Sequence, residues 1–512
     1  MSQLTPDKIL EYSEPAEQIY SDVVDALLLN IAKHFKSGKT LTTQQWEIKK
    51  LSELGAVNEE SAKIIAQMTG QAPSVVLEAL EQTAIAATED TEKALQKGVK
   101  EKKITPPPDE KLLTDKLAKA GGAVLSSIAV REIIDQNQSQ ISDKLKLVNL
   151  NLLNSVQTQY RKIVANTVNI ENRLLQTISD NTQGVLSGAV SRAQALRQTI
   201  TQINKEGLAG FTDKAGRKWS AEAYVNMVMR TTVHNEAIDT VRARQMDYGI
   251  NVFYVSRHSG ARPLCYPYQG RYFSWDNKSG TITDGAGKRH RYSPVSSTSY
   301  GKAAGLFGVN CNHDAVTVIP GISMPHDEVA QDKKQNDKIY AESQKQRYLE
   351  REVRAAKREA AMLEAAGDKE GFEKATLQVR RKQANYSVFC KETGRTKRLD
   401  RTQVFEYNKS VSGKASAATK SIVSSDGISV KKTSHSITQA VKRNITNNQI
   451  ADALKNPLNV TDVKYDNQGR PSKKYIGEKA TVAVNPENGN IVTVHGTHTK
   501  LLNKLKGGEN EV

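Results

Sequence analysis

Two histidines and two cysteines in the middle of the chain have side chains that can hold a metal ion. His258 and Cys265 lie in one short segment, and Cys311 and His313 lie in a second segment further along. Thiolate and imidazole groups suit tetrahedral zinc, and four protein ligands leave no open position for a substrate. These residues are therefore candidates for a structural zinc site that would lock two loops together. The alternative is that the four side chains only pack and hydrogen-bond, because their spacing matches no standard zinc finger.

Residues 431–512 form a basic segment whose side chains could bind and cleave RNA. They include thirteen Lys and Arg against seven Asp and Glu, a net charge of +6, which favours phosphate binding. Cleaving RNA without a metal requires a base for the 2′-hydroxyl, an acid for the leaving oxygen and cations around the phosphorus. The segment contains all three kinds of group. The candidates are His435, Arg443, Lys474, Thr493, His495 and Thr497.

The spacing of these candidates predicts which of them share a face. Thr493, His495 and Thr497 alternate along one predicted strand, so their side chains point to the same side. His435 and Arg443 are eight residues apart near a predicted helix. Within a helix this spacing is a little more than two turns, so the two side chains would lie roughly on one side. Phosphate binding without catalysis is the alternative for the whole set.

Arg230, His234 and Glu236 form a third polar group, on one predicted helix. A cation, an imidazole and a carboxylate can act together in catalysis. A buried polar network is the favoured interpretation of these three residues.

Hydrophobic spacing predicts a helical body followed by smaller mixed regions. Apolar residues recur at three- and four-residue intervals from about Pro6 to Asn204, as is typical of amphipathic helices. Ser220 is expected to cap a helix that runs to about Tyr248, and Val252–Val255 is expected to be a short strand. A charged, Ala-rich segment from 326 to 391 predicts a long helix or a helical hairpin broken near Gly367. The clearest apolar run contains Ile141, Leu145, Val148, Leu152 and Val156.

The C-terminal pattern is different and predicts a compact α+β domain. A helix is expected over 436–454, with strands at 460–465, 480–485 and 491–497. Ser410–Asp426 is rich in small polar residues and predicts a flexible tether. The predicted organisation is a helical region at 1–96, a Lys- and Pro-rich linker at 97–110, a helical region at 111–215, an α+β core at 216–325, charged helices at 326–405, a tether at 406–430 and a basic domain at 431–512.

Composition restricts the class of protein. A chain of 512 residues is too long for one ordinary core, so a multidomain, mainly α architecture is expected. Three cysteines cannot all pair, which favours synthesis in a reducing cytoplasm. The apolar run Val23–Ala32 is too short for a membrane span, and Met1–Gln18 lacks a signal peptide's apolar region. The net charge of +17 favours polyanionic partners such as packaged DNA, RNA or an acidic protein surface.

Several central motifs resemble the phage minor capsid proteins related to Mu F-type head morphogenesis proteins. The resemblance covers most of residues 1 to about 405. It implies a virion component near the portal vertex, with the portal and major capsid proteins as partners and phage DNA nearby. The motifs are RTTVHNEA at 230–237, HSGARP at 258–263, QG at 269–270, GLFG at 305–308, NCNH at 310–313, PG at 320–321 and FCKETG at 389–394.

The last part of the chain, about 431–507, resembles the polymorphic toxin type 50 domain, which is grouped with the barnase, EndoU, colicin and RelE-like ribonuclease folds. This resemblance implies proton transfer by His435 and His495, phosphate contacts from Arg443 and Lys474, and supporting donors at Thr493 and Thr497. The motifs are SHSI at 434–437, NPL at 456–458, GRPS at 469–472, YIG at 475–477, VNP at 484–486 and GNIVTVHGT at 489–497.

Together these features predict a capsid-associated body that carries a toxin acting on RNA, with enzymatic activity confined to the C-terminal domain. That domain is expected to need no cofactor, whereas the central region contains a candidate site for structural zinc. An immunity protein would be a further partner. The rival hypothesis is a purely structural virion protein whose basic C-terminal domain binds nucleic acid or the portal without catalysis.

Overall fold

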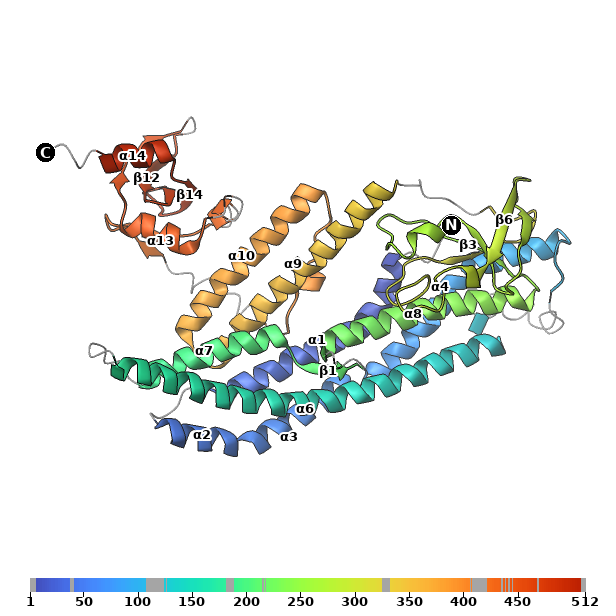
Figure 1. Ribbon diagram of the computed structural model, residues 1–512, viewed down its shortest axis with the longest axis horizontal. Coiled ribbons are helices and arrows are strands. Elements are labelled where there is room, and N and C mark those ends of the chain that lie inside the picture. Colours follow the sequence, from blue (N-terminus) through green and yellow to red (C-terminus); the bar gives the residue numbers. More distant parts are fainter. Residues whose placement is uncertain are drawn as a thin grey trace. The chain divides into compact units, whose positions relative to one another are not determined.

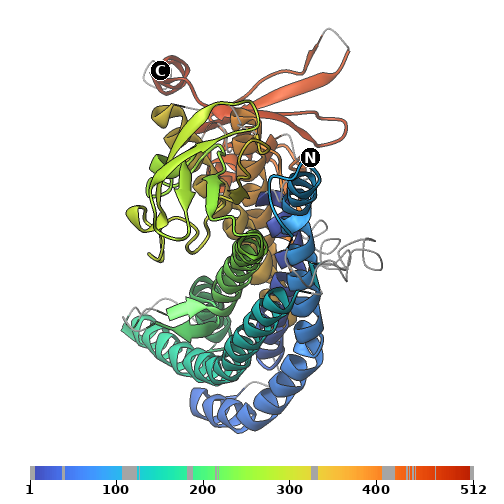
Figure 2. The same cartoon turned by 90° about the vertical axis from the view of Figure 1, so that its right-hand side faces the viewer.

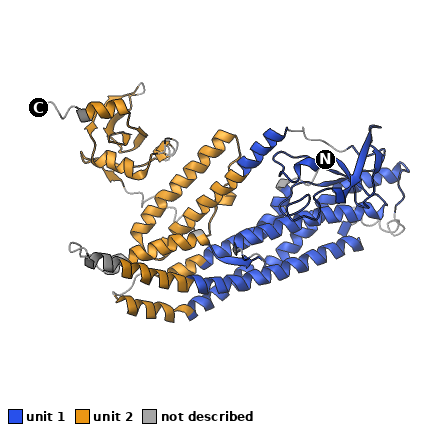
Figure 3. Cartoon of the chain, viewed as in Figure 1, with its two compact units in different colours: residues 1–27, 55–159, 207–343 blue, residues 28–54, 160–206, 344–512 orange. Residues whose placement is uncertain are grey.

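The structure is a computed structural model, shown in Figure 1. It divides into two compact units, coloured blue and orange in Figure 3. The first unit comprises Met1–Leu27, Gly55–Gln159 and Gly207–Ser343, and the second comprises Leu28–Leu54, Tyr160–Glu206 and Gln344–Val512. Each unit is described by itself. The residues that the structure describes are 6–36, 41–106, 124–125, 127–180, 188–213, 216, 218–324, 332–405, 407, 421–433, 436–437, 439–440, 443, 445–466 and 469–507.

Long helices dominate the chain, as the hydrophobic spacing predicts. The longest, α6, is a continuous helix of 53 residues (Figures 1 and 2). The five apolar residues of its clearest run, from Ile141 to Val156, are all buried, which confirms the predicted helix face. Among the described residues, no helix is both long enough and apolar enough to cross a membrane. The helices in this part of the chain are α1 (Pro6–Lys33), α2 (Thr43–Ser52), α3 (Leu54–Thr69), α4 (Ala72–Lys100), α6 (Ile128–Asp180) and α7 (Gly188–Glu206).

Helix α8 (Ala221–Asp247) begins where the sequence predicts it. The Oγ of Ser220 accepts a hydrogen bond from the backbone N–H of Ala223 at 3.3 Å, so this residue is the N-cap. A short antiparallel pair, β1 (Ala209–Thr212) and β2 (Lys218–Ser220), leads into the helix. Within the first unit, α8 packs along α4.

A five-stranded sheet follows α8 in the first unit. Its strands are β3 (Val252–Val255), β4 (Tyr272–Ser274), β5 (Gly280–Thr283), β6 (Arg289–Pro294) and β7 (Ala315–Thr317), in the order β5-β6-β4-β3-β7. Only β4 and β6 pair in parallel. Phe253 stacks on Trp275 with 4.0 Å between ring centroids, at the centre of a buried aromatic cluster. The sequence predicted β3 alone, because the other strands are short and rich in Gly and aromatic residues.

The charged segment forms a helical hairpin, one of its two predicted forms. Its helices are α9 (Lys333–Ala365) and α10 (Lys369–Thr393). Gly367 has a positive φ of 76°, which ends α9, and Asp368 caps α10 by accepting from the N–H of Gly371 at 2.9 Å. In the second unit Asp368 also accepts two hydrogen bonds from Arg197 on α7, at 2.7 and 2.8 Å. The carboxylate therefore both caps α10 and ties the hairpin to a neighbouring helix.

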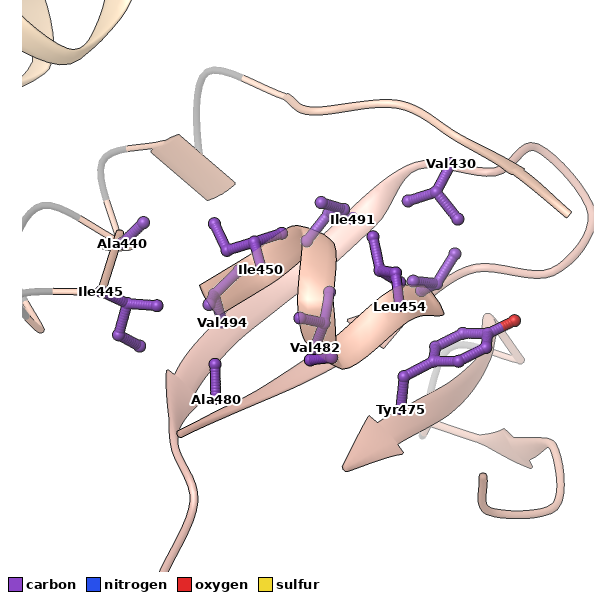
Figure 4. Close-up of a cluster of buried hydrophobic side chains, with 12 residues drawn as sticks. Val430, Ala440, Ile445, Ile450, Leu454, Tyr475, Ala480, Val482, Ile491 and Val494 are labelled. Carbon is purple, nitrogen blue, oxygen red and sulfur yellow. The ribbon is translucent and has the colours of Figure 1, made fainter. Parts of the chain in front are cut away.

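The C-terminal domain is an antiparallel sheet with one helix packed on it. Strands β12, β13 and β14 form its centre, and α13 contacts β12 and β13. Figure 4 shows the core, in which Ile450 and Leu454 of α13 lie over Val482 of β13. The elements are β8 (Ile422–Val423), β9 (Ser429–Val430), α13 (Asn447–Lys455), β10 (Asn459–Val460), β11 (Lys464–Tyr465), β12 (Pro471–Ile476), β13 (Ala480–Val484), β14 (Ile491–Gly496) and α14 (Thr499–Gly507).

The C-terminal domain begins earlier than predicted, because the hairpin of β8 and β9 precedes residue 431 and packs with it. Strands β8 and β9 pair with each other inside the predicted tether, and Val430 belongs to the buried core. Tyr475 donates a hydrogen bond to Asp426 at 2.7 Å, and Lys473 forms an ion pair with the same carboxylate. The hairpin is therefore part of the domain. The rest of the tether, residues 408–420, lies outside the described residues.

Two further sequence predictions need correction. The helix predicted over 436–454 is not continuous, because Arg443 lies in a turn and Thr446 opens α13 with a capping box to Gln449. The predicted linker at 97–110 is helical at its start, since α4 continues to Lys100. Residues 107–110 of that linker lie outside the described residues.

Candidate functional sites

Strand pairing brings the two segments of the histidine and cysteine cluster together. Strand β3 pairs with β7 in antiparallel register, with Val255 opposite Ala315. The ladder continues past the strand ends, where the N–H of Ser256 donates to the carbonyl of Asp314 at 3.0 Å. His258 follows β3 and His313 precedes β7, so both lie at the same end of this ladder.

Three of the four predicted ligands lie within bonding reach of one common ion. The ligand atoms of Cys265, Cys311 and His313 all lie within 4.8 Å of one another, and all three residues are buried. The two Sγ atoms are 3.9 Å apart, and the Sγ of Cys311 is 3.4 Å from Nδ1 of His313. The cysteines are free thiols. The fold therefore brings these three side chains together, although they come from two separate segments of the chain.

His258 lies beside the cluster but outside the group of three. Its ring packs against that of His313 with 4.3 Å between centroids. Its Nδ1 lies 3.1 Å from the carbonyl oxygen of Ser259, and Nε2 is buried with no hydrogen-bond partner among the described residues. An Nδ1–H donor to that carbonyl leaves the lone pair on Nε2. Burial is the main cause that lowers the pKa of His258 to about 4, and the neighbouring His313 adds to it. The low pKa favours the neutral imidazole.

Two further side chains surround the cluster and hold it in place. The Oε1 of Gln269 lies 3.4 Å from Nε2 of His313 and accepts from the backbone N–H of His258 at 3.4 Å. Arg262 donates to the carbonyls of Val309 and Gly305 at 2.6 and 3.2 Å, which clamps the second loop. Gln269 belongs to the QG motif of the family resemblance, but only the folded loop places it beside the cluster.

The two thiols are not equivalent. The guanidinium of Arg262 lies 3.6 Å from the Sγ of Cys265. The hydrogen bond from Cys311, together with this guanidinium, lowers the pKa of Cys265 to about 7. Cys265 is therefore the thiol that lies beside a positive charge.

The polar residues of α8 do not form a common site. Arg230 forms an ion pair with Glu17 of α1, and His234 Nε2 lies 2.9 Å from the backbone carbonyl of His313. Glu236 accepts from Asn137 of α6 at 2.7 Å. The three side chains bond to three different elements of the first unit, as expected for a buried polar network.

Register places most of the proposed RNA-cleaving residues on one face of the C-terminal sheet. Lys474 lies opposite Ala483, which lies opposite Thr493. His495 lies opposite Thr481, two residues further along each strand. Directly paired residues share a face, and so do residues two apart, so Lys474, Thr493 and His495 lie on the same side.

Arg443 and Thr497 extend this face from outside the strands. Arg443 Nη1 donates to Thr493 Oγ1 at 3.1 Å and to the carbonyl of Val494 at 2.6 Å. Strand β14 ends at Gly496, so Thr497 follows the strand and is held by bonds to Thr481 and Gly477 at 3.1 and 2.7 Å. We call Arg443, Lys474, Thr481, Thr493, His495 and Thr497 the basic face; Thr481 was missed because its neighbours in the sequence are apolar. His435 lies outside the described residues.

The ring of His495 contacts the backbone through one of its two nitrogens. Its Nδ1 lies 3.2 Å from the carbonyl oxygen of Gly496, and the side chain is partly exposed. Donation from Nδ1–H leaves Nε2 as the acceptor, which is the state a general base requires.

Comparison with known proteins identifies the class of the chain. Residues 4–391 match the phage minor capsid protein 2 family, and the chain belongs to that family. A curated protein described as "Structural protein" of Lactococcus phage LL-H is 29% identical over 197 residues. That match covers 37% of this chain and 50% of the relative's length. The chain is thus a phage minor capsid protein, as the central motifs predicted.

The family match ends before the C-terminal domain begins, so it carries no information on the basic face. No solved structure matches the chain.

Proposed function

We propose that this virion protein lies near the portal vertex of the phage head and that its C-terminal domain is a metal-independent endoribonuclease. The observation that carries the enzymatic part is the basic face, where an imidazole, two cations and three hydroxyls share one side of a sheet. The imidazole and the cations match the base and the charge stabilisation that RNA cleavage requires, and His435, which lies outside the described residues, is the proposed acid.

In the proposed reaction the 2′-oxygen of RNA attacks the adjacent phosphorus and the 5′-oxygen leaves. Nε2 of His495 accepts the 2′-hydroxyl proton, while His435 donates a proton to the leaving oxygen. Arg443 is held by Thr493 and Val494, so its guanidinium is fixed beside the strand and can stabilise charge on the phosphate. Lys474 is exposed on the same face and adds a second cation. The products are a 2′,3′-cyclic phosphate and a 5′-hydroxyl.

The decisive experiment incubates the full chain with RNA in the presence of EDTA. We expect cleavage that leaves 2′,3′-cyclic phosphate ends. Substitution His495→Ala should lower the rate by about 10²- to 10⁴-fold, the usual effect of removing a general base. The matched control is His498→Ala, because His498 is an exposed histidine that follows the strand. Unchanged RNA, with a C-terminal domain shown to be folded, would refute the enzymatic proposal.

A binding experiment then separates catalysis from a purely structural role. Lys474→Ala should weaken RNA binding. It should also reduce the slope of log K against log salt concentration by about one, because one phosphate contact is lost. Salt-dependent binding of both DNA and RNA without cleavage would support the rival hypothesis, in which the basic domain only holds nucleic acid or the portal.

The virion part of the proposal predicts specific neighbours. The portal and major capsid proteins should cross-link to this chain in purified virions, and the number of copies per particle should be low. Absence of the chain from purified virions would contradict the proposed location. An active toxin domain also implies an immunity protein, which should bind the C-terminal domain and block its cleavage of RNA.

A further inference from the structure

We propose that Cys265, Cys311, His313 and His258 form a closed tetrahedral zinc site in the first unit. The proposal is independent of the ribonuclease activity, because the cluster and the basic face belong to different units. Its chemistry is that of a structural centre, in which two thiolates and two imidazoles fill the coordination sphere.

The spacing of the donor atoms is close to what zinc requires. With Zn–S bonds of about 2.3 Å and Zn–N bonds of about 2.0 Å, a regular tetrahedron separates two sulfurs by about 3.8 Å and a sulfur from a nitrogen by about 3.5 Å. The Sγ atoms of Cys265 and Cys311 are 3.9 Å apart, and Sγ of Cys311 is 3.4 Å from Nδ1 of His313. Two of the three separations are therefore close to tetrahedral spacing, and the third, between Cys265 and His313, is at most 4.8 Å.

The hydrogen bonds around the two histidines leave the correct nitrogen available on each ring. Nε2–H of His313 points to Gln269 Oε1, so the Nδ1 that faces Cys311 carries the lone pair. In His258 the contact of Nδ1 with the carbonyl of Ser259 leaves Nε2 as the ligand atom. That Nε2 is buried and has no hydrogen-bond partner among the described residues, which costs free energy unless something binds it. A zinc ion held by the other three ligands would satisfy it once the His258 side chain turned toward them.

A disulfide between the same cysteines explains less of the site. It would consume the two sulfurs but leave the buried nitrogen of His258 and the inward-facing Nδ1 of His313 without a role. Zinc binding uses all four groups and releases the two thiol protons to solvent. The ion would also join the loop that follows β3 to the loop that precedes β7. These loops contain little regular secondary structure.

The test measures metal content of the full chain after purification from zinc-supplemented cells. We expect about one equivalent of zinc, and its loss in Cys311→Ser. Cys390→Ser is the matched control, because Cys390 is a buried cysteine of α10 in the other unit and should retain the metal. Gln269→Ala should keep the ion but weaken affinity by about 10- to 100-fold, as loss of an outer hydrogen bond to a ligand does.

Cobalt titration of the unmutated protein keeps the test valid if a cysteine variant fails to fold. We expect the thiolate charge-transfer and ligand-field absorption of a tetrahedral site, displaced by zinc. Less than about a tenth of an equivalent of zinc together with no cobalt spectrum would overturn the proposal, as would a Cys265–Cys311 disulfide in the freshly isolated protein. If His258→Ala binds zinc with unchanged affinity, His258 is not the fourth ligand and the site is not closed.

Discussion

Replacing Tyr475 by Phe should weaken the C-terminal domain by a predictable amount. Tyr475 is fully buried in β12, and its hydroxyl donates to Asp426 Oδ1 at 2.7 Å. Asp426 is also paired with Lys473, and these interactions lower the pKa of its carboxyl despite partial burial. The substitution removes the hydrogen bond to the charged Asp426 and a longer one to Ser424 Oγ at 3.3 Å, and it leaves the aromatic ring in place.

The magnitude follows from the type of bond that is lost. Hydrogen bonds to charged groups contribute about 1.5–3 kcal/mol, and Asp426 keeps its contacts with Lys473 and Ser424. We therefore expect a loss of about 2 kcal/mol in the stability of the domain. This corresponds to about a 30-fold fall in the protection of its slowest-exchanging amides.

Hydrogen exchange measured by mass spectrometry on the full chain can report on this domain alone. The peptides to follow cover β12, β13 and β14, which form the centre of the sheet. Tyr465→Phe is the matched control, because Tyr465 is 69% exposed on the neighbouring strand β11 and its loss should change nothing. Equal protection in Tyr475→Phe and Tyr465→Phe would refute the conclusion that the β8–β9 hairpin is an integral part of the domain.

Two other substitutions test packing and buried charge. Burial raises the pKa of Glu236 from 4.5 to about 7, so the folded state holds a proton that the unfolded chain releases, and stability should fall as pH rises through that window. Glu236→Gln should remove this loss, measured by the pH dependence of amide exchange in α8; an identical pH dependence in both proteins would contradict it. Gly477→Ala should lower protection in α13 and β13, because the new Cβ would lie 2.7 Å from Cα of Ala453. Gly496→Ala, where a Cβ meets nothing within 4 Å, is its control and should retain protection.

Local patterns in the sequence were enough to predict the helices and part of the C-terminal domain. The apolar run of α6 and the cap at Ser220 depend on residues three or four positions apart, so short windows contain the information. The same holds for β13 and β14, whose apolar residues form continuous or alternating runs. The β8–β9 hairpin was missed because its strands are two residues long and its polar composition is that of a linker.

The sequence by itself determined which residues carry thiol, imidazole and cationic groups, and it predicted that Thr493 and His495 share a face. It also contained the motifs of the minor capsid family, which the family match over residues 4–391 bears out. It did not determine which of these groups meet. Cys265 and Cys311 come within 3.9 Å only because β3 pairs with β7, and Lys474 joins His495 only through the register of β12, β13 and β14. Strand pairing joins residues far apart in the chain, so no local periodicity encodes it, and the tertiary structure alone decides these contacts.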